Sequence, residues 1–209
     1  AHMHKEFTFE HCSTVSEMNP EIAPPLRLTD CSLVTDGAAA LILTTDENAA
    51  TFPKSVAMRA AEHVNDFLPM SRRDFLAFEG PERAFAQAFK AANVTLEDID
   101  FAEVHDCFTI AELLTYEAMG LAPKGQGARA LEDGTVYRGG ALPVNLSGGL
   151  KAKGHPVGAT GVSMHALAFR QLTNQAGDLQ VPGAELGLLF NRGGSAVANY
   201  VSVLEARKV

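Results

Sequence analysis

The sequence predicts a layered α/β fold with a mixed sheet, and two observations support this prediction. Segments with strand-like patterns alternate with segments of helical spacing, and turns rich in glycine, proline or asparagine separate them. The chain has 209 residues, of which 46% are hydrophobic and 20% charged, as in an ordinary globular protein. This length is sufficient for one good-sized domain, or for one domain plus part of another.

The first part of the chain contains few regular patterns. About thirty irregular residues, punctuated by prolines, come first. Residues 38–45 form a short apolar run, which fits a strand buried on both faces or equally the start of a helix. Residues 45–48 would cap a brief helix after it. Residues 55–64 have mixed periodicity and are interpreted as a strand.

The central part shows clearer elements. A helix is predicted from Gly80, because apolar residues recur at helical spacing up to position 92 and acidic residues lie near its start. Residues 99–104 alternate enough for a strand, and residues 109–119 continue as a helix. Residues 125–141 hold five glycines and are interpreted as a long loop, a feature that is often functional.

The last part predicts one helix and two strands. Residues 158–175 have the spacing of a helix that is apolar almost all round, which indicates a buried central helix. Residues 186–190 and 196–204 are predicted strands. The segment between them, 191–195, is interpreted as a turn.

Composition and charge exclude several classes of protein. The net charge is −8, and lysines and arginines are scattered, so we expect neither a nucleic-acid partner nor an anionic membrane surface. No apolar run approaches the ~20 residues that cross a bilayer. The three cysteines lack metal-ligand spacing and fit a reducing compartment, so we expect a cytoplasmic protein. Residues 1–4 are interpreted as the scar of a cleaved expression tag.

The first chemistry-bearing motif is Val104-His105-Asp106-Cys107-Phe108. It lies at a predicted strand-to-helix junction, where α/β proteins place ligands. The helix N-terminus and a nearby imidazole are expected to lower the pKa of the Cys107 thiol. The alternative is structural, because free cysteines are among the most buried residues.

The second motif is a glycine-rich segment, residues 147–161, that holds a single histidine, His155, before a helix. Glycines allow a backbone to approach a ligand closely, and the following Pro156 keeps the histidine in an extended segment. The alternative is that His155 is a turn residue. The residues alone suggest a candidate Cys/His site, but nothing in the sequence places Cys107 and His155 together in space.

The two motifs together resemble those of thiolases. Gly148-Gly149, followed by residues 153–161 (KGHPVGATG), is similar to the thiolase signature GG…GHPxGA(S/T)G. Residues 105–108 (HDCF) resemble the variant in thiolases of the sterol-carrier-protein-2 type, where other thiolases have Asn-Glu-Ala-Phe. The order and separation of the motifs also match, and residues 25–40 look like the last strand of the family's first half.

The resemblance implies the C-terminal half of the thiolase fold, with α/β/α layers and a mixed five-stranded sheet. Residues 1–54 would contain the tag scar, the irregular segment and the last strand and helix of the N-terminal half. Residues 55–209 would form the C-terminal domain. The implied reaction is reversible Claisen condensation or thiolysis of 3-oxoacyl-CoA, with coenzyme A thioesters as substrates and neither a further cofactor nor a metal.

The resemblance also implies residue roles. His155 matches the histidine that activates the acyl-accepting cysteine, Cys107 the acid/base thiol of this subclass, and His105 the donor to a thioester oxyanion. Other matching positions would line the pantetheine channel: Ser32, Phe108, Gly148 and Gly149.

One departure concerns the C-terminal turn. Most thiolases place their acid/base cysteine there in a Cys-x-Gly sequence, whereas residues 191–194 (NRGG) contain no cysteine. This agrees with the HDCF subclass, in which Cys107 takes that role. Gly193 could supply a backbone N–H to a second oxyanion hole, and a plain hairpin turn is an equal alternative.

A second departure concerns the nucleophile. Cys12 and Cys31 lie in segments unlike the surroundings of a thiolase nucleophile, so we expect the acyl-accepting cysteine to be absent from this chain. The chain alone would then be inactive and would associate, through the apolar helix 158–175, with itself or with a partner carrying the first half. The alternative is a non-catalytic acyl-CoA-binding or scaffold module. A ketoacyl synthase is a weaker third possibility.

Overall fold

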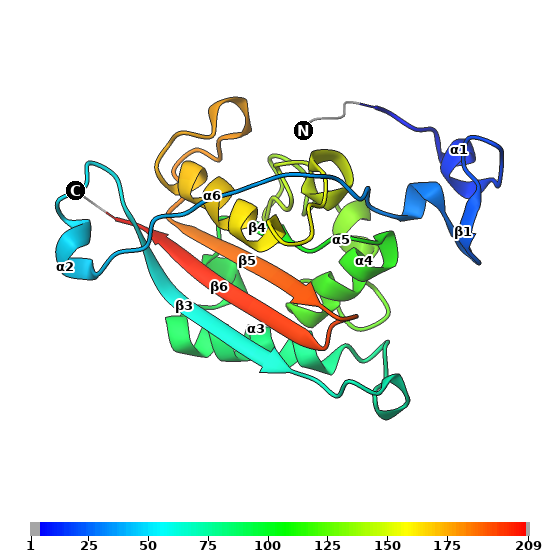
Figure 1. Ribbon diagram of the computed structural model, residues 1–209, viewed down its shortest axis with the longest axis horizontal. Helices are drawn as coiled ribbons and strands as arrows, with labels where there is room; N and C mark the ends of the chain where they lie inside the picture. The colour runs from blue at the N-terminus through cyan, green and yellow to red at the C-terminus, as the bar shows by residue number, and fades with distance from the viewer. Residues whose placement is uncertain (1–4, 208–209) are drawn as a thin grey trace.

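A computed structural model describes residues 5–207, so the expected tag scar at residues 1–4 lies outside the described residues. The main sheet is mixed and is ordered β3 (Val56–Asn65), β6 (Ala198–Ala206), β5 (Leu186–Gly193), β4 (Phe101–Val104) (Figure 1). β4 and β5 run parallel, and the other two pairs are antiparallel. The predicted α/β class is confirmed.

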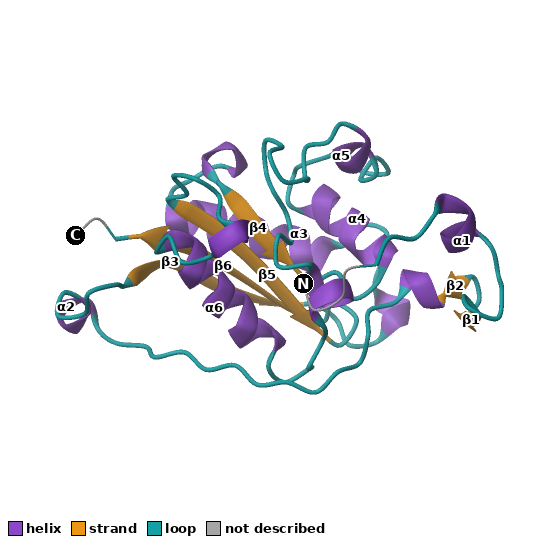
Figure 2. Cartoon of the chain, turned by 90° about the horizontal axis from the view of Figure 1, so that it is seen from above, coloured by secondary structure: helices purple, strands orange, loops and turns teal. Residues whose placement is uncertain are grey.

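Helices cover both faces of this sheet. α3 (Glu79–Ala92) packs on β3 and β6, and α4 (Thr109–Ala118) lies beside it. α6 (Thr160–Leu172) packs on the opposite face against β5 and β6 (Figure 2). The predicted α/β/α layering is therefore confirmed, and the helices at 80–92, 109–119 and 158–175 form within one or two turns of their expected bounds.

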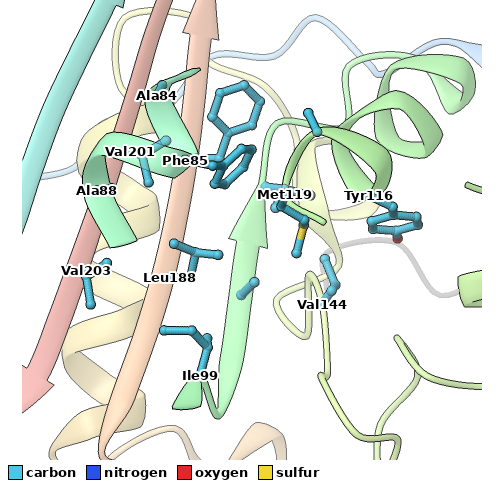
Figure 3. Packing of buried hydrophobic residues seen from close by; sticks show 14 of the residues in the cluster. Ala84, Phe85, Ala88, Ile99, Tyr116, Met119, Val144, Leu188, Val201 and Val203 are labelled. Carbon is cyan, nitrogen blue, oxygen red and sulfur yellow. The ribbon is translucent and has the colours of Figure 1, made fainter. Parts of the chain in front are cut away.

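The alternation of side chains along β5 explains why the strand reads as one apolar run. Leu188 and Phe190 point into the core under α3, and the Phe190 ring packs on the Phe85 ring with 4.9 Å between centroids. Figure 3 shows Leu188 in this core with Phe85 and Ala88 of α3. Leu189 points the other way, into the core under α6. A strand buried on both faces requires apolar residues at successive positions, and that is the pattern the sequence shows.

The expectation of a five-stranded sheet is corrected to four strands within residues 5–207. The fifth position, beside β4, is occupied by residues 143–145, which make a single parallel bridge between Val144 and Ala102. Pro143 has no N–H to donate, and Asn145 has a φ of 53°, which turns the chain away from an extended path. The ladder therefore ends after one bridge.

The N-terminal part is peripheral. It contains α1 (Phe9–Ser13), a small antiparallel pair of β1 (Glu21–Ala23) and β2 (Leu26–Arg27), and α2 (Asp46–Ala49). Thr45 caps α2, as predicted: its side chain accepts a hydrogen bond from a backbone N–H in the first turn. Other short elements are α5 (Arg129–Glu132), η1 (Leu28–Asp30), η2 (Met70–Arg72), η3 (Leu96–Asp98), η4 (Gly149–Lys153) and η5 (Gly177–Leu179).

The prediction of a buried strand or helix start at residues 38–45 was wrong. This segment crosses the molecule without forming regular secondary structure (Figure 1). Ile42 is 87% exposed and Leu43 79% exposed. Within the described part of the chain no strand pairs with this segment, and all of its residues except Ala39 are exposed.

The interpretation of residues 191–195 as a turn is also corrected. Asn191 and Arg192 continue β5, paired with Tyr200 and Asn199 of β6. The reversal occurs later, where Ser195 and Ala196 adopt positive φ angles. The two polar residues therefore stand on a rigid strand instead of on a flexible connection.

None of the helices formed by residues 5–207 combines the length and the apolarity needed to cross a bilayer.

The close pairing of β4 and β5 predicts a steric test of the fold. A Cβ on Gly187 would overlap the Phe101 ring of the neighbouring strand. We therefore expect Gly187→Ala to lower the free energy of unfolding by about 1–3 kcal/mol, the usual cost of overpacking a core. Urea denaturation measures this. The matched control is Gly158→Ala, whose added methyl meets open space, and equal stability losses in the two variants would contradict the packing described here.

Candidate functional site

His105 and His155 come together where β4 and β5 end. Because β4 and β5 are parallel, with Val104 opposite Phe190, their carboxyl ends lie at the same edge of the sheet. His105 follows Val104 directly. Its ring meets the His155 ring edge to face, with 5.0 Å between centroids. The structure therefore brings the two motifs together, which the sequence could not establish.

His105 is a neutral imidazole near pH 7. Burial lowers its pKa from 6.5 to about 4, because the charged form loses its hydration; the hydrogen bond to Asn191 acts in the opposite direction. His105 Nδ1 lies 2.6 Å from Asn191 Oδ1. With this oxygen as acceptor, the imidazole proton is on Nδ1 and Nε2 carries a lone pair. A donor role for Nε2 requires the Asn191 amide to turn over, so that its N–H group donates to Nδ1.

His155 is held in the same Nδ1–H tautomer as His105, which suits it to act as a base. Its Nδ1 lies 2.8 Å from Thr160 Oγ1, and that hydroxyl donates its own proton to the Pro156 carbonyl oxygen at 3.1 Å. Thr160 must therefore accept from His155 Nδ1–H, which leaves the Nε2 lone pair free. Burial lowers the pKa of His155, and nearby Lys153 and Arg192 lower it further. The ring is thus neutral and able to accept a proton at neutral pH.

Cys107 contacts a cation. Arg192 Nη2 lies 3.1 Å from Cys107 Sγ, and the Ser32 N–H donates to the Cys107 carbonyl oxygen at 2.8 Å. Burial raises the pKa of the thiol, and Arg192 lowers it to a smaller extent. The expectation of a lowered thiol pKa was therefore wrong in direction. The physical reason is that the neighbouring His105 is neutral and desolvation outweighs the helix N-terminus.

Buried carboxylates hold the two motifs against each other. Asp106 Oδ1 accepts from the Leu150 N–H at 2.7 Å. A side chain at Gly149 would overlap the Asp106 carboxylate, so only glycine permits this approach. Three residues earlier in each segment, Glu103 accepts a hydrogen bond from the Ser147 hydroxyl at 2.6 Å. The HDCF segment and the glycine-rich segment are thus fixed relative to each other.

A second buried carboxylate network supports β4 from the other side. Glu112 accepts hydrogen bonds from Tyr116 at 2.8 Å and from Asn145 at 3.1 Å, and Asn145 in turn accepts from the Val104 N–H. Burial raises the pKa of Glu112 to about 7. This network sets the end of β4, from which His105 projects.

The other predicted site residues lie around this centre. Phe108 precedes α4, is 38% exposed and forms a backbone bridge with Cys31. Gly148 has a φ of 96° and leads into the π-helical turn η4. Gly193 is the exposed last residue of β5. The assignments of Ser32, Phe108, Gly148 and Gly149 to a pantetheine channel, and of Gly193 to an oxyanion hole, remain predictions.

Sequence reasoning missed the roles of Asn191, Arg192 and Thr160. Asn191 contacts His105, Arg192 contacts Cys107, and Thr160 orients His155. One signal was available: two polar residues directly follow the apolar run 186–190, where a strand ends at the sheet edge that binds ligands.

Two further features concern metal and ligand binding. Within residues 5–207 no group of three or more His, Cys, Asp or Glu side chains is arranged to hold a metal ion. An open depression of about 470 Å³ lies between residues 97–100, 138–146 and 180–182. None of the predicted site residues lines this depression.

Comparisons with known proteins identify relatives of the chain. A family model described as thiolase C-terminal domain-like matches residues 61–206. The chain is 45% identical over 176 residues to an acetyl-CoA acetyltransferase of Methanothermobacter thermautotrophicus, covering 83% of this chain and 46% of that protein. It is 38% identical over 203 residues to human sterol carrier protein 2, covering 93% of this chain and 37% of that protein. The chain thus spans less than half the length of these two relatives.

Solved structures share the fold at lower identity. An Ltp2-ChsH2(DUF35) aldolase superposes with a TM-score of 0.75 at 21% identity, covering 96% of this chain and 51% of that one. The acetyl-CoA acetyltransferase of Bacillus anthracis gives a TM-score of 0.62 at 20% identity, covering 85% of this chain and 38% of that one.

The lowered pKa of His105 predicts a pH-dependent stability. Between pH 6.5 and about 4 the unfolded chain binds a proton at this residue and the folded chain does not, so acidification favours unfolding. Wild type should lose on the order of 3 kcal/mol more unfolding free energy over this range than His105→Asn, which cannot titrate. Urea denaturation at a series of pH values gives both curves. Parallel curves would contradict a buried neutral His105.

Proposed function

The chain belongs to the thiolase superfamily as a C-terminal domain, and we propose that it supplies the acid/base side of a thiolase active site. The reaction is reversible Claisen condensation or thiolysis of 3-oxoacyl-CoA. One observation carries the proposal. His105 and His155 are in contact near the carboxyl ends of β4 and β5, and Cys107 lies there too, paired with Arg192.

His155 is the base in this proposal. Its Nε2 lone pair is free because Nδ1 donates to Thr160. In the first half-reaction of the condensation direction Nε2 takes the proton of an acyl-accepting thiol, and the resulting thiolate attacks the thioester carbonyl of the donor acyl-CoA. The coenzyme A thiolate leaves and takes up a proton. In thiolysis the enzyme thiolate attacks the 3-oxo carbonyl instead, and the acetyl-CoA enolate leaves. The charge of Lys153 and Arg192 nearby favours returning the proton from His155.

Cys107 handles the proton at the α-carbon. In the condensation direction its thiolate removes a proton from the α-carbon of an acyl-CoA, and the carbanion attacks the acyl group held on the enzyme. The bond between the acyl group and the acyl-accepting sulfur then breaks, and that sulfur leaves as a thiolate. In thiolysis the Cys107 thiol returns that proton to the leaving acetyl-CoA enolate. His105 stabilises the enolate oxygen once the Asn191 amide turns to place the proton on Nε2.

The acyl-accepting thiol is proposed to come from residues outside this sequence. Cys31 Sγ lies 3.4 Å from the Arg27 carbonyl oxygen, and Cys12 lies in α1 at the periphery. Neither is hydrogen-bonded to His155. A composite site, completed by a thiolase N-terminal half or a second subunit, therefore accounts for the residues present. The same completion would cover Ile42 and Leu43.

Thiolysis of acetoacetyl-CoA, followed as loss of enolate absorbance, tests this proposal. The chain is assayed alone and after mixing with the N-terminal half of a close relative expressed separately. We expect no turnover from the chain alone and turnover from the mixture. His155→Ala should reduce that turnover by about 10²–10⁴-fold, the usual contribution of general acid–base catalysis. His63→Ala is the matched control, since His63 is exposed on β3 and stacks on Tyr200.

Three results would overturn the proposal. Turnover by the chain alone, removed by Cys31→Ser, would place the acyl acceptor within this sequence. Turnover of the mixture unaffected by His155→Ala would remove the proposed base. A mixture that binds coenzyme A but never turns over would instead support a non-catalytic acyl-CoA-binding module.

A further inference from the structure

We propose that Arg192 is the counter-ion that stabilises the thiolate form of Cys107. The two side chains come from different segments, Arg192 from β5 and Cys107 from the turn that follows β4. Arg192 Nη2 lies 3.1 Å from Cys107 Sγ, which is hydrogen-bond distance for a sulfur acceptor. Because Arg192 stands on a strand, this contact is set by the register of the sheet.

Arg192 has no carboxylate partner among residues 5–207. No Asp or Glu side chain of the described chain forms a salt bridge with it, and its Nε atom is buried without a hydrogen-bond partner. Its guanidinium lies 5.6 Å from the centre of the Phe78 ring, which offers a cation–π contact but no negative charge. The sulfur is thus the group that can neutralise this cation.

A buried cation is costly unless an anion compensates it. A neutral thiol is only a weak acceptor, whereas a thiolate is both an anion and a strong one. The contact with Arg192 therefore stabilises the thiolate more than the neutral thiol, and it offsets part of the cost of burying the anion. The charge of neighbouring Asp106 raises the pKa of the Cys107 thiol, whereas hydrogen bonds from the backbone of Cys107 and Phe108 lower it.

The pairing offsets part of the desolvation of the sulfur. Burial raises the pKa of the Cys107 thiol and Arg192 lowers it, while Cys107 is the charged neighbour that acts on the pKa of Arg192. Removal of the guanidinium would leave only the weaker backbone contribution to oppose the effect of burial. Arg192 is accordingly a positioning and charge-setting residue, acting through Cys107, and is not itself expected to touch the substrate.

This inference rests on the proposed acid/base role of Cys107, but its test requires no turnover and thus separates the two. Alkylation of each cysteine by iodoacetamide is followed by peptide mass spectrometry between pH 6 and 11. The midpoint of each pH profile gives the thiol pKa, because only the thiolate reacts. Cys12 and Cys31 serve as internal controls within the same molecule.

The charge-removing variants are Arg192→Gln and Arg192→Met, the second keeping an unbranched chain that tolerates burial. We expect the Cys107 midpoint to rise by about one pH unit or more, so that alkylation at pH 8 slows about tenfold. Arg192→Lys keeps a cation and should retain a midpoint below that of both variants. Arg59→Gln removes one positive charge from the Glu205 ion pair and should leave the Cys107 profile unchanged.

The profiles also separate a structural role from an electrostatic one. Loss of packing alone would change the limiting rate at high pH, through access, without moving the midpoint. An unchanged Cys107 midpoint in a folded Arg192→Gln or Arg192→Met protein, with Cys12 and Cys31 profiles as in wild type, would overturn the inference. So would an Arg192→Lys midpoint equal to that of the uncharged variants.

Discussion

The parallel pairing of β4 with β5 is the constraint on which the site depends. A parallel ladder sets successive residues of both strands level with each other, so the residues that follow Val104 and Phe190 emerge at one edge. These residues are His105 and Asn191, and a hydrogen bond joins their side chains. The burial of Leu188, Leu189 and Phe190 in two separate cores holds β5 against any shift in register.

The loops that carry His155 and Cys107 are ordered by buried polar groups and not by secondary structure. Asp106 and Glu103 each accept hydrogen bonds from the glycine-rich segment, and burial raises the pKa of both carboxyl groups. Such groups are costly to bury unless satisfied, so the segment that satisfies them is held in one place. Gly149 is required here for a steric reason, independent of any ligand.

Burial also gives the site its chemical character. It lowers the pKa of His105 and His155, which keeps both imidazoles neutral, and raises the pKa of Cys107. In such surroundings a single guanidinium has a large effect, because little water screens it. Arg192 contacts the thiol and also lowers the pKa of His155. Neutral imidazoles beside the cations Arg192 and Lys153 suit proton transfer.

The sequence by itself determined the layered α/β class, most helices and strands, and the two motifs with their histidines and cysteine. Those features follow from periodicity and from short contiguous patterns, which one chain segment can display alone. The extended, unpaired path of residues 38–45 could not be read this way, since an apolar run looks the same whether or not a neighbouring strand covers it. The sequence also did not predict that the sheet ends at Val144, or that Asn191 and Arg192 belong to β5. Only the tertiary structure decided that His105 meets His155, that Cys107 meets Arg192 and that the thiol pKa is raised instead of lowered. These outcomes depend on burial and on contacts between residues 50 to 86 positions apart, which no local pattern encodes.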